Sequence, residues 1–235
     1  MRPLRVTRRA LAVTLALAVP VTAATSVAVA QTGLVPGLDF ADSPPSRVTP
    51  PPWPNQVIAN VPPGQAAPLI AGGASVGKGV ALYFSSGIGP GGLNAAAPAG
   101  TPERFVDPAR LEAGTLAGGV TLTEAQAINA LERIRDNLTS VGLTGEDVIS
   151  MRVFLDNPPG TEVADYAGWN RAYRQFFANT NLDTGEPLAV PLGTGAPAPP
   201  LSVNPVRPSR TTLEVASLPV AGWLVEIEVV ARFKR

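Results

Sequence analysis

Alternation of apolar and polar positions marks the end of the chain, residues 207–235. From residue 223 to residue 233 the odd positions are apolar, whereas the even positions include Glu226 and several other charged residues. A period of two places alternate side chains on opposite faces, so we expect a strand with one buried and one wet face. An earlier run around Leu213 alternates too, and residues 218–222 interrupt the pattern with a proline and a glycine. We therefore predict two adjoining β-strands joined by a short connection.

Helical spacing appears twice further upstream. Thr123 is a suitable N-cap with Gln126 three residues later, and apolar residues then recur at 3–4-residue intervals. Gly142 fits the left-handed position that follows a helix end. A second helix is expected over residues 165–178, where aromatic residues gather on one side.

The remaining pattern predicts two further strands and two long loops. Residues 79–86 and 147–155 are rich in β-branched and aromatic residues and read as strands. Residues 91–120 and 179–206 are rich in glycine, alanine and proline without a regular period, so we expect loops there. The order strand, helix, strand, helix, strand, strand indicates an α+β domain with two helices packed on one face of a mixed sheet.

The N-terminus has the features of an export signal. Residues 1–30 combine four arginines, an apolar run and an Ala-Val-Ala cleavage sequence. The apolar run is short and contains a proline, which favours cleavage over retention as a membrane helix. The adjacent arginines Arg8 and Arg9 fit either a twin-arginine signal or an ordinary basic segment. We expect an exported, periplasmic or extracellular protein that has no membrane segment after cleavage.

Composition divides the rest of the chain into an arm and a domain. Residues 31–65 are rich in proline, which favours extended conformations and cannot form a core alone. Residues 66–235 are expected to form one domain, with 91–120 and 179–206 as insertions.

The chain contains no histidine and no cysteine. Serine-histidine-aspartate triads, cysteine-histidine pairs and ordinary zinc sites are therefore excluded. Proton transfer would have to use carboxylates, lysine, tyrosine, backbone groups or water. Without residues 1–30 the chain keeps 14 basic against 18 acidic residues. This acidic balance does not favour nucleic-acid binding, which depends on basic side chains.

A glycine-rich stretch at residues 72–79 nearly matches the phosphate-binding motif G-x-x-x-x-G-K-[ST]. Gly79 stands where the hydroxyl residue that binds Mg²⁺ is required, and a strand follows where the motif needs a helix. We therefore interpret this stretch as a turn that precedes a strand.

Several segments, in order along the chain, resemble the RidA (YjgF) family. They are Tyr83–Gly87, Ala125–Gly142, Asp147–Leu155, Trp169–Phe177, Pro208–Val215 and Val225–Glu228. The resemblance implies a chorismate-mutase-like α+β fold that assembles as a homotrimer, with sites in the clefts between subunits. The chain differs from well-studied members of the family at two places. It has Thr212 where they often have cysteine, and it has no tyrosine in residues 66–78, where they place an aromatic residue.

The resemblance also implies a reaction and its residues. In the family an arginine, here Arg210, binds the substrate carboxylate, and a glutamate, here Glu226, helps to position or activate the hydrolytic water. The same cleft is lined by residues that match Ser86, Gly87, Asn170 and Thr212. The implied reaction is hydrolysis of a reactive 2-imino or enamine acid to a 2-keto acid and ammonia. It uses neither cofactor nor metal, so none is expected.

Two other functions remain open. The same trimeric cleft could capture a small carboxylate in the cell envelope without turning it over. An RNA-cleaving activity, which accompanies some relatives, fits poorly with an acidic chain that lacks histidine.

Overall fold

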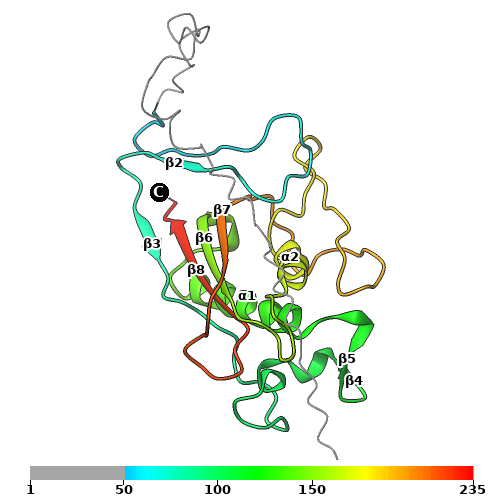
Figure 1. The fold of residues 1–235 in the computed structure, drawn as a ribbon. Coiled ribbons are helices and arrows are strands. Elements are labelled where there is room, and N and C mark those ends of the chain that lie inside the picture. The colour runs from blue at the N-terminus through cyan, green and yellow to red at the C-terminus, as the bar shows by residue number, and fades with distance from the viewer. Residues whose placement is uncertain (1–50, 235) are drawn as a thin grey trace, which may run out of the picture. The chain divides into compact units, whose positions relative to one another are not determined.

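The computed structural model describes residues 51–234 and contains a four-stranded mixed sheet. Its strands lie in the order β3 (Leu82–Phe84), β8 (Val225–Arg232), β6 (Val148–Leu155) and β7 (Ser209–Glu214). β8 is antiparallel to both of its neighbours, whereas β6 and β7 are parallel. Figure 1 shows β7, β6, β8 and β3 side by side. The α+β class expected from the sequence is confirmed.

The expectation that the last two strands adjoin is wrong. β6 lies between β7 and β8 and pairs with both of them. The physical reason is that β6 is an apolar strand with two free edges, and each C-terminal strand fills one edge. The connection 215–224 therefore crosses from one side of β6 to the other and does not close a hairpin (Figure 1).

Both helices pack on the same face of the sheet, as expected. α1 (Leu122–Ser140) and α2 (Tyr166–Arg174) join the buried alternate residues of β6 and β8 in one apolar core. Along β8 the burial alternates strictly, with odd positions buried and even positions half-buried. Apolar side chains thus determine which face of each strand the helices cover.

The start of α1 differs from the prediction, whereas its end agrees. The N-cap is Thr121, whose hydroxyl accepts a hydrogen bond from the backbone N–H of Glu124. Gln126, which the sequence suggested as a capping partner, instead donates to the backbone oxygens of Pro102 and Gly222. Gly142 has a φ of 77°, the left-handed conformation expected after the helix.

The second helix begins as predicted and ends earlier. Asp165 caps it by accepting a hydrogen bond from the backbone N–H of Gly168. The regular helix stops at Arg174, and residues 175–178 continue as turns. The expected aromatic side is present, because Trp169 and Tyr173 are fully buried.

Short elements occupy the segments around this core. Two small antiparallel sheets are formed by β1 (Val57–Ala59) with β2 (Ala74–Val76), and by β4 (Leu111–Glu112) with β5 (Thr115–Leu116). The 3-10 helices are η2 (Pro102–Phe105), η3 (Pro108–Arg110), η4 (Ala117–Gly119) and η5 (Gly145–Asp147). β1 lies within the segment expected to be a proline-rich arm, and the 91–120 insertion contains the β4–β5 hairpin.

The 179–206 insertion has no helix or strand, in agreement with the prediction of a loop. A buried carboxylate attaches it to the helices. Glu124 accepts hydrogen bonds from Arg171 of α2 at 2.9 and 2.8 Å and from the backbone N–H of Gly193 at 2.9 Å. One side chain of α1 therefore holds both α2 and the insertion.

The signal predicted at residues 1–30 lies outside the described residues. Within residues 51–234, no helix is both long and apolar enough to cross a membrane.

Candidate functional site

The first candidate residue, Arg210, lies on the edge strand β7 and points toward the helices. Its register partner in β6 is Met151, which is buried in the core beneath the helices. Partners in adjacent strands point to the same side of a sheet, so Arg210 shares the helix-covered face. Thr212 is two residues further along β7 and therefore lies on the same face as Arg210.

Helix α2 holds the Arg210 guanidinium. Nη2 donates a hydrogen bond to Oδ1 of Asn170 at 2.7 Å. The guanidinium carbon lies 4.4 Å from the ring centroid of Tyr173 and 5.6 Å from that of Trp169. Such contacts with aromatic faces fix the plane of the guanidinium and favour its positive charge. Asn170 and Arg210, both predicted as substrate-binding residues, are thus in direct contact.

Unused hydrogen-bonding capacity remains around Arg210. Nη1 of Arg210 and Oγ1 of Thr212 are buried and have no hydrogen-bond partner among residues 51–234. Burial lowers the pKa of the Arg210 guanidinium and raises the pKa of the Tyr173 phenol. An arginine remains charged despite such a shift, so this region presents a fixed cation with a spare donor.

The second candidate group, Glu226, lies on β8 against Gly87. A Cβ atom placed on Gly87 would come within 1.8 Å of Oε1 of Glu226, so the carboxylate occupies the space that glycine leaves free. Ser86 is exposed beside this contact, and no hydrogen bond of its side chain is seen within residues 51–234. Gly87 and Glu226, both predicted as site residues, thus lie against each other.

The environment of Glu226 alters its acidity. Burial, together with the negative charge of Glu228, raises the pKa of the Glu226 carboxyl. Glu228 forms an ion pair with Arg152 at 2.9 Å, whereas Glu226 forms none within the described part of the chain. Glu226 is therefore a carboxylate that is not committed to a structural ion pair.

The two groups lie on opposite faces of the sheet. Glu226 pairs with Phe154, on the face away from the helices, whereas Arg210 pairs with Met151 on the helix-covered face. β6 also separates their strands. The candidate residues therefore form two separate groups in one chain, here called half-sites: Arg210 with Asn170 and Thr212, and Glu226 with Gly87 and Ser86.

Sequence reasoning missed the aromatic platform under Arg210. Trp169 and Tyr173 were recognised only as the apolar side of a helix, although they flank Asn170 on the same α2 turn. Tyr173 is further fixed because its hydroxyl donates to the backbone oxygen of Leu69 at 3.1 Å. Among residues 51–234, no cluster of three or more carboxylates could hold a metal ion.

Taken together, the mixed four-stranded sheet, the two helices on one face and the arginine and glutamate strands define an α+β protein of the Rid type. The family model described as "Endoribonuclease L-PSP" matches residues 108–233, which is more than half of the chain. The chain therefore belongs to this family, the Rid/YjgF/UK114 family.

Solved structures of the same family are similar to this chain. The Rid-family protein YyfB of Yersinia pestis is 16% identical, with a TM-score of 0.42 over 75% of this chain and 98% of that chain. Rv2704 of Mycobacterium tuberculosis is 19% identical, with a TM-score of 0.35 over 76% and 100% of the two chains. Escherichia coli TdcF, solved with bound serine, is 23% identical, with a TM-score of 0.37 over 76% and 98%. A comparison with curated proteins found no match.

Proposed function

We propose that this protein hydrolyses small 2-imino or enamine acids to 2-keto acids and ammonia, at sites shared between neighbouring copies of the chain. The observation that carries the proposal is the Arg210 guanidinium, held by Asn170 and Tyr173 with Nη1 unpaired. A planar fork of donors matches a carboxylate, which it can bind through two parallel hydrogen bonds.

The proposed chemistry needs a base and a water, but no cofactor. Water adds to the imine carbon while the Glu226 carboxylate accepts one of its protons, and the nitrogen is protonated. The resulting carbinolamine then breaks its C–N bond, so that ammonia leaves and the 2-keto group forms. A carboxylate with a raised pKa suits this role because it can accept a proton and then return it.

Assembly is part of the proposal, because Arg210 and Glu226 lie on opposite faces of one chain's sheet. Only a second copy can bring a glutamate half-site to an arginine half-site. The face away from the helices supports such an association, since Phe84 is 65% exposed and Leu213 is 49% exposed there. A homotrimer, expected from the family resemblance, would form three equivalent sites.

The alternative is a carboxylate-binding protein without turnover. It is favoured by one observation, namely that Asn170 and Tyr173 hold the Arg210 guanidinium without any contribution from Glu226. An RNA-cleaving function would lack imidazole groups for acid–base catalysis, because the chain has no histidine. From the signal-like residues 1–30 we further propose that the protein acts after export.

Turnover of freshly generated 2-iminobutyrate, with 2-oxobutyrate binding measured in parallel, tests the proposal. Arg210→Ala should lower kcat/KM about 30- to 150-fold, the equivalent of about 2–3 kcal/mol for a lost charge-assisted contact. Glu226→Gln should lower turnover about 100-fold or more, the usual contribution of a general base, while 2-oxobutyrate still binds. Arg135→Ala is the control, because Arg135 is exposed and, within residues 51–234, its side chain pairs only with its neighbour Asp136. Binding without turnover in the unaltered protein would establish the alternative.

A further inference from the structure

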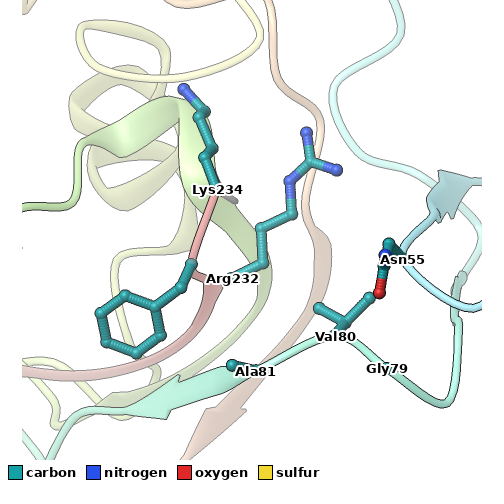
Figure 2. Close-up of a pocket in the computed structure, with 7 residues that line it drawn as sticks. Asn55, Gly79, Val80, Ala81, Arg232 and Lys234 are labelled. Atoms are coloured by element: carbon teal, nitrogen blue, oxygen red, sulfur yellow. The ribbon is translucent and has the colours of Figure 1, made fainter.

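A pocket of about 390 Å³ lies at the far end of β8, away from both half-sites. It is lined by Arg232 and Lys234 from the end of the chain, by Val80 and Ala81 before β3, and by Asn55 and Gly79 (Figure 2). Arg232 is six residues beyond Glu226 on the same strand, which corresponds to about 20 Å. The pocket is therefore separate from Glu226, and Arg232 lies on the face of the sheet opposite Arg210.

The two cations of this pocket differ in how they are compensated. Nζ of Lys234 lies 3.1 Å from Oδ1 of Asp147 and 3.8 Å from Oε2 of Glu146. The Arg232 guanidinium forms no ion pair and no side-chain hydrogen bond within residues 51–234. Figure 2 shows the Arg232 side chain extended, with its guanidinium away from the Lys234 ammonium. The pocket thus presents one uncompensated, half-buried cation.

Glycines build the wall opposite Arg232. A Cβ atom on Gly79 would come within 2.6 Å of Oδ1 of Asn55, so only glycine allows the Asn55 amide to lie there. The backbone N–H of Gly79 also donates to the oxygen of Pro54 at 2.6 Å. At Gly77 a Cβ atom would meet the backbone oxygen of Trp53 at 2.0 Å. These contacts give the glycine-rich stretch 72–79 a role in shaping a pocket.

We propose that this pocket is a second ligand site, for a small organic molecule with one carboxylate and a compact apolar body. The Arg232 fork would bind the carboxylate, and the Asn55 amide supplies a neutral hydrogen-bonding group on the opposite wall. Val80 and Ala81 give the apolar surface between Arg232 and Asn55. One uncompensated cation favours a monoanion over a dianion. The volume lies in the range of small-molecule pockets.

Binding of benzoate, compared with neutral benzamide, tests this site by ligand-observed NMR and calorimetry on the full chain. We expect saturable benzoate binding that weakens as salt is raised, and no benzamide binding at equal concentration. Arg232→Gln should weaken benzoate binding at least tenfold, because a charge-assisted hydrogen bond is lost. Arg232→Lys keeps the charge without the fork and should recover part of the affinity.

Two further variants separate this site from the proposed hydrolytic site and from folding defects. Val80→Phe fills the pocket without altering charge and should also abolish the benzoate binding that Arg232→Gln weakens, whereas Arg210→Ala should leave this Arg232-dependent binding in place. Circular dichroism and thermal unfolding verify that each variant is folded. The proposal is overturned if the unaltered protein does not bind benzoate at about 10 mM, if Arg232→Gln binds normally, or if Arg210→Ala abolishes binding. None of these outcomes depends on whether imine turnover is observed.

Discussion

The substitution Gly87→Ala should impair the function of the Glu226 carboxylate and leave the stability of the fold almost unchanged. The added Cβ would lie 1.8 Å from Oε1 and 2.7 Å from the carboxyl carbon of Glu226. Ordinary contact needs about 3.4 Å or more, so the carboxylate must move by roughly 1.5 Å. A misplacement of about 1 Å in a reacting group can lower a rate about 100-fold. We therefore expect imine turnover to fall about 100-fold.

The same substitution should hardly affect folding. The obstructing atoms are the end of a flexible side chain, and the φ of Gly87 is not in the left-handed region. The free energy of unfolding should therefore change by less than about 1 kcal/mol, which urea denaturation measures. Gly73→Ala is the matched control, because a Cβ there meets no atom of the described residues within 4 Å.

A double mutant makes this test decisive. If Gly87→Ala acts by displacing the Glu226 carboxylate, it should add little to the loss already caused by Glu226→Gln. Multiplicative losses in the double mutant would refute the reasoning, as would normal turnover in Gly87→Ala alone. Either result would show that Gly87 matters for another reason, or that Glu226 is not the base.

Two other predictions concern the buried carboxylate of α1 and the pH dependence. Glu124→Gln removes the charge that pairs with Arg171 in a fully buried position, so urea denaturation should show a loss of about 3 kcal/mol. The exposed-pair control Asp136→Asn should cost less than about 0.5 kcal/mol, and equal losses would contradict this assignment. For the pH dependence, Glu226 must be ionised to act as a base, so its raised pKa means that turnover falls as the pH decreases through that value. Glu228→Gln removes a like charge, which lowers the pKa of Glu226 and should move the acid limb of kcat/KM to lower pH; an unchanged limb would contradict this cause.

Local patterns predicted the elements well because their causes are local. The alternation along β8 reappears as alternating burial, and Gly142 takes the left-handed conformation that ends α1. The start of α1 was misplaced because Thr121 and Thr123 are both suitable caps in the sequence. The prediction chose Thr123 because Gln126 lies three residues later, as in a capping box. In the structure Gln126 instead donates to the backbone oxygens of Pro102 and Gly222, which approach it only in the folded chain.

The hydrophobic pattern of the sequence could predict neither the order of the strands nor the separation of Arg210 from Glu226. Alternation says which side chains share a face of one strand, but not which strand lies next to it. β6 has two pairing edges, and nothing near Arg210 or Glu226 in the sequence indicates that it separates them. The residues of the two half-sites came from the family resemblance, whereas their placement on opposite faces required the register of three strands.

The separation of the half-sites links the proposed chemistry to assembly. Each chain offers an arginine half-site at the edge strand β7, beside α2, and a glutamate half-site on the face that the helices leave uncovered. In a closed ring of copies, every arginine half-site can meet the glutamate half-site of a neighbour, and no half-site is left over. An isolated chain would keep the Arg210 contacts with Asn170 and Tyr173, because these lie within one subunit. Under the proposed function, carboxylate binding is therefore a property of the chain, whereas hydrolysis is a property of the assembly.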